Sequence, residues 1–195
     1  MRILAGDSRG RRFKSVPRTF PVKPISSRIK KSVFDILRPW LAEARFLDLY
    51  AGTGAVGLEA LSRGAASCFF VDRDRRCLAV IDENLKALDL AAKGRTSYGD
   101  VLQDLSWLAY RAGVATFDLI YLGPPYRDAQ DRPLHDSTPS LARVAQAGLL
   151  APGGLILIQH HVKEEVALPA GYERFRREKY GDTFVDFHRR RPAAA

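Results

Sequence analysis

The fold is decided by residues 46–65, FLDLYAGTGAVGLEALSRGA, where an apolar run meets a glycine-rich turn and then a helical pattern. Residues 46–50 are apolar enough for a buried strand, because a strand covered on both faces shows little polar alternation. Residues 56–62 fit a short helix that ends at Gly64. The stretch therefore predicts one strand, turn and helix, the repeating unit of a parallel α/β sheet.

The turn contains Gly52, Gly54 and Gly57 in a GxGxxG spacing, directly after the strand and before the helix. Glycines in this position let a nucleoside-bearing ligand approach the backbone closely. Asp72 follows the next expected strand, residues 68–71, and a carboxylate there can accept hydrogen bonds from both ribose hydroxyls. The pattern alone fits a dinucleotide, S-adenosylmethionine or a purely structural turn.

Two features favour S-adenosylmethionine over a nicotinamide dinucleotide. The chain after the turn is short for the separate substrate domain that nicotinamide enzymes normally carry. Asp48, four residues before Gly52, adds a carboxylate at the strand end, which suits the cationic amino group of methionine and would repel a pyrophosphate. We therefore expect a methyl-donor site and keep a nicotinamide oxidoreductase as an alternative.

The rest of the chain continues the alternation. Further strands are expected at residues 68–71, 96–98, 117–122 and 155–159, and helices at residues 75–88, 101–112 and 141–147. Residues 172–178 and 183–189 predict a closing antiparallel hairpin. This order predicts an α/β fold with a mostly parallel, seven-stranded sheet covered by helices on both faces.

The net charge of +9 lies entirely in the first quarter of the chain. Residues 1–45 hold 12 Lys and Arg against three acidic residues, whereas residues 46–195 hold 19 of each sign. A localised basic segment indicates a polyanion partner such as RNA, and a solvated tail that only aids solubility is the alternative. We therefore divide the chain into a basic N-terminal extension, residues 1–45, and a methyltransferase domain, residues 46–195.

Two elements are expected in the basic extension. Residues 2–5 and 12–16 flank a turn-rich link and predict a hairpin. Ser26 or Ser27 is a plausible N-cap for a basic amphipathic helix, whose apolar residues at helical spacing are Ile29, Val33, Ile36, Leu37, Trp40 and Leu41. The residues that we expect to contact RNA are Arg9, Arg11, Arg12, Arg28, Lys30 and Lys31.

A second motif follows the strand expected at residues 117–122. Gly123, Pro124, Pro125 and Tyr126 form a rigid turn with an aromatic residue at its tip. Such a loop leaves the carboxyl end of its strand, where ligands of α/β sheets bind. Its main-chain oxygens can accept hydrogen bonds from an exocyclic amine, and Tyr126 offers a face on which a base can stack. A rigid loop whose tyrosine caps the core is the structural alternative.

Cysteine and histidine usage gives no sign of a metal site. Cys68 and Cys77 form no CxxC pair, and we interpret both as core thiols. The four histidines are dispersed or adjacent; the pair His160 and His161, at a strand end, could line the site. The first residues lack the apolar core of an export signal, and no apolar run is long enough for a membrane span. These features lead us to expect a cytoplasmic protein without a metal or a membrane partner. As a separate expectation, we take the protein to be a monomer.

Together, LDLYAGTGAVGLEALSRGA, FFVDRD and GPPY resemble the RsmD family of class I methyltransferases, which methylate the N2 amine of a guanine in small-subunit (16S) ribosomal RNA. The likeness covers nearly the whole chain, up to the closing turn at residues 180–183. It implies a Rossmann-like class I fold, S-adenosylmethionine as cofactor, and ribosomal RNA or a small-subunit assembly particle as partner. The cofactor contacts expected from the motifs and the resemblance are Asp48, Tyr50, Ala51, Gly52, Gly54, Asp72, Arg73, Asp100 and Val101.

One position departs from the family. The motif is normally Asp or Asn followed by Pro-Pro-Tyr or Pro-Pro-Phe, whereas this chain has Gly123. The missing side chain would accept a hydrogen bond from the target amine, and loss of such a group costs about 10²- to 10³-fold in rate by analogy with oxyanion-hole deletions. We expect a slower enzyme whose catalytic loop is residues 123–126. A DNA or RNA adenine-N6 methyltransferase and a catalytically impaired RNA-binding homologue remain alternatives.

Overall fold

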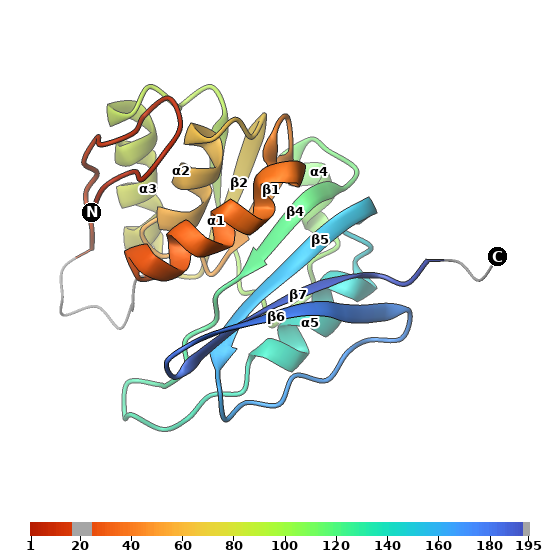
Figure 1. The fold of residues 1–195 in the computed structure, drawn as a ribbon. Helices are drawn as coiled ribbons and strands as arrows, with labels where there is room; N and C mark the ends of the chain where they lie inside the picture. The colour runs from red at the N-terminus through yellow and green to blue at the C-terminus, as the bar shows by residue number, and fades with distance from the viewer. Residues whose placement is uncertain (17–24, 193–195) are drawn as a thin grey trace.

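The computed structural model describes residues 1–16 and 25–192, and one seven-stranded sheet organises it (Figure 1). The strands are β1 (Arg45–Leu49), β2 (Ser67–Asp72), β3 (Gly94–Tyr98), β4 (Phe117–Leu122), β5 (Leu150–His161), β6 (Tyr172–Tyr180) and β7 (Thr183–Arg190). They lie in the order β3-β2-β1-β4-β5-β7-β6. β1 to β5 are parallel, whereas β7 pairs antiparallel with both β5 and β6. The expected α/β fold with a closing hairpin is confirmed.

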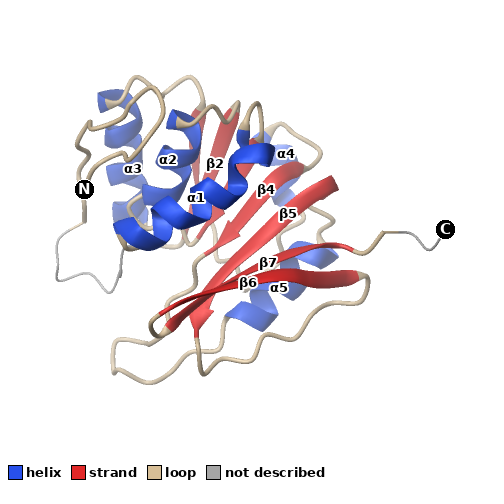
Figure 2. Ribbon diagram, viewed as in Figure 1, coloured by secondary structure: helices blue, strands red, loops and turns tan. Residues whose placement is uncertain are grey.

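Helices cover both faces of the sheet (Figure 2). They are α1 (Ser27–Leu41), α2 (Ala55–Ser62), α3 (Arg75–Ala87), α4 (Trp107–Ala112) and α5 (Ser137–Gln146). α1, α2 and α3 share one apolar cluster with the sheet, and α4 and α5 share the other. On β1, Phe46 belongs to the first cluster and Leu47 to the second, because successive strand residues point to opposite faces. This double burial explains why β1 reads as a nearly continuous apolar run.

Because β1 to β5 are parallel, all their carboxyl ends lie along one side of the sheet and all their amino ends lie along the other. We call these two sides edges. The carboxyl ends of β1 to β5 meet at one of them, which we call the carboxyl edge (Figure 1). α2 and α3 each follow a strand and run back along it, so they end at the other edge, which we call the opposite edge. In α/β sheets of this kind, ligands bind outside the carboxyl edge.

One expected helix is confirmed only in its second half. The sequence favoured a helix over residues 101–112, but only α4, its second half, is helical. Asp100 Oδ1 accepts a hydrogen bond from the backbone N–H of Leu102 at 3.0 Å, and Asp104 Oδ1 accepts one from Ser106 at 3.0 Å. Such side-chain bonds offer the backbone an alternative to the helical pattern, which explains the turns before α4.

Helix α1 begins where it was expected. Ser26 caps it, with its hydroxyl oxygen accepting a hydrogen bond from the Ile29 N–H at 3.2 Å. The buried stripe nevertheless differs from the expected one, because it includes Lys30 and leaves Trp40 40% exposed. A charged residue therefore occupies a core-facing position of this helix.

The N-terminal segment, residues 1–16, forms a less regular hairpin than expected. Arg2 and Arg12 make a single antiparallel bridge, and the Ile3 N–H donates to the Arg11 carbonyl at 3.0 Å. The turn of this segment docks against the end of α2, where a Cβ on Gly6 would lie 1.7 Å from the Ser62 carbonyl oxygen. Only glycine fits at this contact, which also has a φ of +83°.

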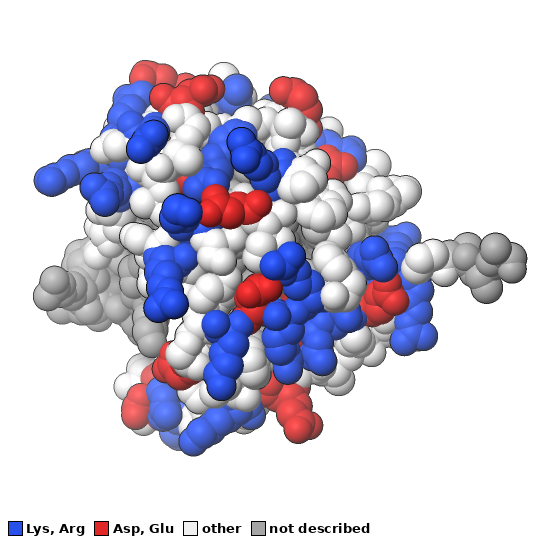
Figure 3. Space-filling view, in the orientation of Figure 1, with Lys and Arg blue, Asp and Glu red and all other residues white. Residues whose placement is uncertain are grey.

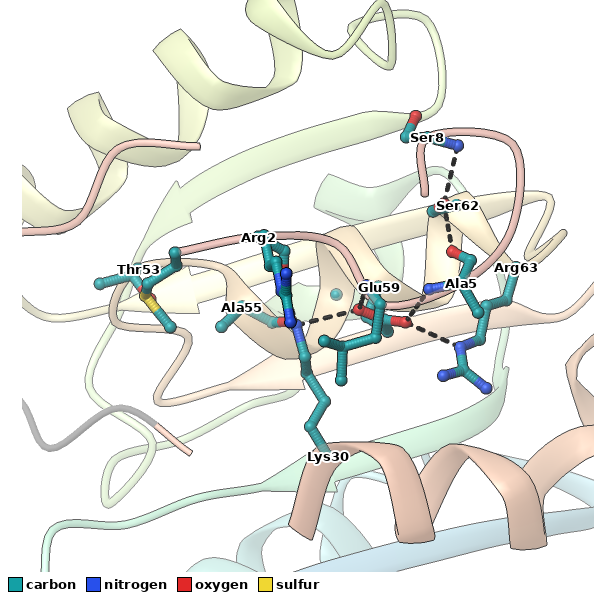
Figure 4. Close-up of polar contacts among 12 residues, drawn as sticks. Arg2, Ala5, Ser8, Lys30, Thr53, Ala55, Glu59, Ser62 and Arg63 are labelled. Atoms are coloured by element: carbon teal, nitrogen blue, oxygen red, sulfur yellow. Dashed lines mark hydrogen bonds and ion pairs between the residues drawn. The ribbon is translucent and has the colours of Figure 1, made fainter. Parts of the chain in front are cut away.

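A buried charge cluster anchors the N-terminal segment to α2 (Figure 4). Lys30 Nζ lies 2.9 Å from Glu59 Oε2, and Arg63 Nε donates to Glu59 Oε1 at 2.8 Å. The backbone N–H groups of Leu4 and Ala5 donate to the same carboxylate at 2.9 and 3.0 Å. Glu59 is fully buried, so these four donors provide the compensation that a buried charge requires.

None of the described helices is long and apolar enough to cross a membrane.

Candidate active site

The glycine loop, residues 50–54, connects β1 to α2 at the carboxyl edge. Gly52 and Gly54 have φ values of 53° and 74°, a left-handed conformation that glycine adopts without strain. The Gly52 N–H donates to Asp72 Oδ2 at 2.7 Å, which ties the loop to the end of β2. Gly57 lies inside α2, where a Cβ would come within 2.3 Å of a phenylalanine ring on β2. The glycines therefore serve both the tight turn and the close contact between helix and sheet.

Asp48, on β1, connects this strand to α2 beneath the glycine loop. It is 1% exposed, and its Oδ2 accepts a hydrogen bond from the Gly57 N–H at 2.9 Å. Burial raises the pKa of Asp48 to about 8, so a proton on this carboxyl is favoured near neutral pH. The carboxyl lies beneath the loop, and its expected contact with the amino group of a methionine moiety stays a prediction. Its role here is to fix α2 on β1.

Two acidic candidates lie in more open positions at the ends of β2 and β3. Asp72 is partly exposed, and burial of its remaining surface raises its pKa. Its Oδ1 accepts a hydrogen bond from the Asp74 N–H at 2.9 Å, which fixes the side chain. Asp100 is also partly exposed and follows β3. Both carboxylates lie at the carboxyl edge, where the sequence placed them.

The remaining cofactor candidates differ in exposure. Arg73 is exposed, whereas Ala51 and Val101 are buried. Tyr50 has a φ of 62°, unusual for a residue with a side chain, and its hydroxyl oxygen lies 2.7 Å from Ser140 Oγ on α5. Tyr50 therefore ties the glycine loop to a helix on the far face of the sheet.

The Pro-Pro loop, residues 123–126, leaves β4 beside the glycine loop. β1 and β4 are paired with Leu49 opposite Leu122, so the two loops begin at neighbouring positions. The Gly123 N–H also donates to the Leu49 carbonyl at 3.3 Å. The structure thus brings the two sequence motifs to one place at the carboxyl edge.

Tyr126 is held by a relay of side chains from β4, β5 and β7. Its hydroxyl accepts a hydrogen bond from Gln159 Nε2 at 2.8 Å and donates to Thr183 Oγ1 at 3.4 Å. The Tyr121 hydroxyl donates to Gln159 Oε1 at 2.8 Å. The His161 ring meets the Tyr126 ring edge-on, with centroids 5.9 Å apart. Burial raises the pKa of Tyr126, so the hydroxyl stays neutral, and the contacts with Gln159, Thr183 and His161 hold the ring at the loop.

The space beside Gly123 is filled by Tyr121. A Cβ added to Gly123 would lie 3.0 Å from Tyr121 Cε1 and 3.6 Å from the Tyr121 hydroxyl oxygen. Tyr121 is 4% exposed and packed on all sides, so its ring has little room to move. A larger residue at position 123 therefore has to displace this ring by a few tenths of an ångström.

The predicted RNA contacts fall into three groups. Lys30 is wrong as an RNA contact, because it is 2% exposed and paired with Glu59; desolvation by burial lowers its pKa. Arg28 and Lys31 are exposed on α1. The remaining predicted contacts lie in the exposed part of the N-terminal segment, and they are Arg9, Arg11 and Arg12.

Arg11 is engaged by the protein itself. Its Nη1 donates to the Leu88 carbonyl at 3.1 Å and to Asp89 Oδ2 at 2.9 Å, and its Nη2 donates to the Ala87 carbonyl. These groups terminate α3, where a cation also complements the helix dipole. Because α3 ends at the opposite edge, Arg11 lies away from the candidate site.

Several residues of the site had no signal in the sequence. Gln159 and Thr183 hold Tyr126, and Ser140 contacts Tyr50, yet each is distant in sequence from its partner. The strand-end position of His161 was the one available hint, and the structure places it against Tyr126. Among the described residues, no group of three or more His, Cys, Asp or Glu side chains is placed to hold a metal ion.

A mostly parallel seven-stranded sheet, with a glycine loop after β1 and an acidic residue at the end of β2, defines the class as a Rossmann-like methyltransferase fold. The family model described as "Conserved hypothetical protein 95" matches residues 1–189. Ribosomal RNA small subunit methyltransferase D of Escherichia coli (strain K12) is 30% identical, over 95% of this chain and 94% of that protein. The chain therefore belongs to the RsmD family of ribosomal RNA methyltransferases.

Other similar proteins agree with this assignment. The YlbH protein of Bacillus subtilis (strain 168) is 33% identical, over 98% of this chain and 100% of its own. The solved structure of yhhF from Escherichia coli has a TM-score of 0.80 and 27% identity, and covers 98% of both chains. A more distant structure, SMU.776 in complex with S-adenosylhomocysteine, has a TM-score of 0.62 at 18% identity, covers 82% of this chain and 48% of that one, and shares the fold.

Proposed function

We propose that this protein transfers a methyl group from S-adenosylmethionine to the exocyclic N2 amine of a guanine in 16S ribosomal RNA. The observation that carries the proposal is the pairing of β1 with β4, which brings the glycine loop and the Pro-Pro loop to one edge of the sheet. Family membership supports a ribosomal RNA substrate. Such a substrate would be met in the cytoplasm, on free RNA or on an assembling small subunit.

The residues of the carboxyl edge fit the cofactor. Asp72 and Asp100 offer partly exposed carboxylates, which are suited to ribose hydroxyls and to the adenine amine respectively. Gly52 and Gly54 keep side chains out of the space above the loop. When bound, S-adenosylmethionine supplies a methyl group on a sulfonium that is already activated for transfer. The structural neighbour with bound S-adenosylhomocysteine supports the same cofactor class.

Four further residues complete the proposed cofactor pocket. Tyr50 and Ala51 supply backbone at the start of the loop, and Arg73 and Val101 flank the two carboxylates in sequence. Ala51 is fixed by its N–H, which donates to the Val71 carbonyl at 3.1 Å. We assign these residues to shape and position, because the loop backbone is anchored before any ligand binds.

The Pro-Pro loop carries the substrate side of the site. We assign Tyr126 to stacking on the target base and the main-chain oxygens of Gly123 and Pro124 to orienting its amine. Pro125 keeps the loop rigid, since its ring fixes the backbone φ angle. A preorganised loop contributes to rate by holding the amine close to the donated methyl group, and no covalent intermediate is required.

Methyl transfer by the purified protein tests the proposal. A donor with a tritiated methyl group is supplied with 16S ribosomal RNA, with small subunits lacking the modification, or with duplex DNA, and the labelled nucleoside is identified by mass spectrometry. We expect label in N2-methylguanosine from the RNA or the subunits. Label in N6-methyladenine from either nucleic acid would contradict the assignment.

Gly123 favours one second candidate, a homologue that binds RNA without turning over. The position lacks the side-chain acceptor of the family motif. Calorimetry with S-adenosylhomocysteine, combined with a single-turnover assay, separates the two functions. We expect cofactor binding with a slow but measurable methyl transfer, whereas cofactor binding with no transfer to any of the three substrates would favour the silent homologue.

A further inference from the structure

A groove with a volume of about 730 Å³ runs between α1 and β6, and we call it the α1–β6 groove. Figure 3 shows Lys and Arg side chains gathered over α1 and over the β6–β7 hairpin on this face of the molecule. The residues of the groove that carry the argument are Arg28, Lys31, Ser32, Arg38, Arg176 and Glu178. Arg28 and Lys31 were predicted from the sequence as RNA contacts, whereas the wall formed by β6 was not, because it lies more than a hundred residues from α1.

The groove carries a net charge of +2, because four basic side chains line it against the acidic Asp35 and Glu178. Lys31 is neutralised by Asp35 at 2.8 Å, and Arg176 is paired with Glu178 at 2.8 Å. Arg28 and Arg38 also line the groove, and neither has an ion-pair partner within the described part of the chain. Two guanidinium groups without an ion-pair partner in the described part of the chain therefore face the groove. The two exposed ion pairs contribute little energy, so Lys31 and Arg176 can exchange their carboxylate partners for a phosphate.

A chain of contacts connects the groove to the candidate active site. The Tyr180 hydroxyl donates to Ser32 Oγ at 2.6 Å, which joins the end of β6 to α1. Tyr180 begins the short turn to β7, and Thr183 on the other side of that turn contacts the Tyr126 hydroxyl. Ser32, which lines the groove, is thus bonded to the turn that supports the Pro-Pro loop.

An exposed aromatic ring lies on the same side of the β6–β7 hairpin. Phe175 is 36% exposed and packs edge-on against Phe187, a member of the apolar cluster beneath α1. The Arg189 guanidinium lies 5.0 Å from the centre of the Phe175 ring. An aromatic ring beside arginines is the combination that binds single-stranded nucleic acid, because bases stack on the ring while the cations contact phosphates.

We propose that the α1–β6 groove binds the sugar–phosphate backbone of the single-stranded RNA segment next to the methylated nucleotide. This inference rests on the proposed function and adds to it the path of the substrate. It adds β6 to the contacts predicted on α1, and it leaves out Arg11, which is used to terminate α3 at the opposite edge. A negatively charged backbone complements Arg28, Arg38 and Arg176, and Phe175 offers a stacking surface.

The test compares two triple variants that remove the same charge. The groove variant carries Arg28→Ala, Arg38→Ala and Arg176→Ala, and the control carries Arg95→Ala, Arg111→Ala and Arg143→Ala on exposed positions of β3, α4 and α5. Fluorescence anisotropy with an unstructured labelled RNA oligonucleotide gives the dissociation constant over a range of salt concentrations. Each lost phosphate contact lowers the slope of log affinity against log salt by about 0.7 for single strands.

We expect the groove variant to bind RNA about 10-fold or more weakly and to lose about two units of that slope, with the control unchanged. Equal losses in both variants would overturn the inference, because affinity would then follow net charge alone. Equal affinity of the wild-type protein for labelled polyglutamate, lost in the same groove variant, would also overturn it and indicate an acidic protein partner.

Two further measurements separate this inference from the proposed function. Binding of S-adenosylhomocysteine to the groove variant should match the wild type, since none of the three arginines lies at the glycine loop. Anisotropy measures RNA binding without any turnover. A wild-type protein without methyl-transfer activity would therefore contradict the proposed function, while RNA binding in the groove could still be tested. If the triple variant loses its helical circular dichroism, the single variant Arg38→Glu replaces it. We expect this variant to bind RNA more weakly than the wild type.

Discussion

The two edges of the sheet use charged residues in opposite ways. At the opposite edge, the turn of the N-terminal segment packs on the end of α2, and Arg11 binds the end of α3. The polar groups of the turn and of Arg11 make hydrogen bonds within the protein. At the carboxyl edge, Asp72 and Asp100 remain partly exposed beside two preformed loops. The comparison teaches that charge in the sequence marks function only where the fold leaves it unsatisfied or open to solvent.

Adjacent lysines show the same contrast on a single helix. Lys30 points into the molecule and neutralises Glu59, whereas Lys31 is exposed and pairs with Asp35 one turn along the helix. The two lysines are indistinguishable in the sequence, but in the structure Lys30 is buried and Lys31 is exposed. Changes that break the internal contacts should therefore reduce stability, and changes at the carboxyl edge should reduce binding or rate.

The largest effect is expected from Glu59→Ala, next to the N-terminal anchor. The change leaves Lys30 buried without its partner and leaves the N–H groups of Leu4 and Ala5 without acceptors. Removing one member of a buried ion pair costs about 3–5 kcal/mol, so the free energy of unfolding in urea should fall by that amount. The exposed pair of Glu83 with Lys14 provides the control, since Glu83→Ala should leave the urea midpoint unchanged.

A urea midpoint for Glu59→Ala close to that of the control would contradict the structural role of the cluster. It would mean that the N-terminal segment detaches without a thermodynamic consequence for α2.

The next effect concerns the catalytic loop and has the opposite sign. The double variant Gly123→Asp with Tyr121→Leu restores the acceptor of the family motif and removes the ring that its Cβ would meet. We expect the rate of methyl transfer to rise by about 10²- to 10³-fold, the amount that a well-placed acceptor contributes. Gly123→Asp alone should gain less, because its Cβ lies 3.0 Å from the Tyr121 ring.

Single-turnover rates of the two single variants and the double variant form the cycle that checks this coupling. Additive effects would show that Tyr121 does not restrict position 123. No gain in any variant would show that the missing side chain does not limit the reaction.

A smaller effect is expected from Asp72→Asn at the end of β2. The variant keeps the shape of the side chain and loses its charge, and charge-assisted hydrogen bonds are worth about 1.5–3 kcal/mol. Calorimetry should therefore show roughly 10- to 100-fold weaker binding of S-adenosylhomocysteine. Asp82→Asn, on the exposed side of α3, serves as the matched control. Unchanged cofactor affinity in Asp72→Asn would place the ribose elsewhere.

The smallest effect lies at the opposite edge and depends on pH. Arg45 donates two side-chain hydrogen bonds to Asp118, which hold the pKa of that carboxyl below its usual range. A carboxyl whose pKa is lowered by folding stabilises the protein above its unfolded pKa, about 3.9, and loses this contribution as the pH falls further. Because the pair is about a third exposed, the contribution is below about 1 kcal/mol.

Thermal unfolding of wild type and Asp118→Asn at pH 7 and pH 3 measures this contribution. The two proteins should differ at pH 7 and converge at pH 3. A constant difference between them would mean that the ion pair is not its source.

The local sequence was sufficient for the sheet and for the glycine loop. β1, the loop and α2 are contiguous, and their apolar run and glycines are dictated by burial and backbone geometry within one short segment. The Pro-Pro loop could be placed for the same reason. Residues 101–106 were assigned to a helix because the apolar spacing outweighed the turn-forming tendency of two aspartates.

Contacts between distant segments were beyond local reasoning. Lys30 looked solvent-exposed because Glu59, its partner, lies on another helix. The bond between Asp48 and the Gly57 N–H could not be foreseen, because the strand-end position alone does not show that α2 covers this carboxyl. The relay from Tyr121 through Gln159 to Tyr126 joins two strands whose register no local pattern reveals.

The most direct test of the central claim is nucleoside mass spectrometry of 16S ribosomal RNA from cells with and without this protein. We expect N2-methylguanosine to fall by one residue per 16S molecule in the deletion strain and to return when the wild-type chain is supplied. Complementation with Asp72→Asn should restore it more slowly. An unchanged N2-methylguanosine content in the deletion strain would contradict the account.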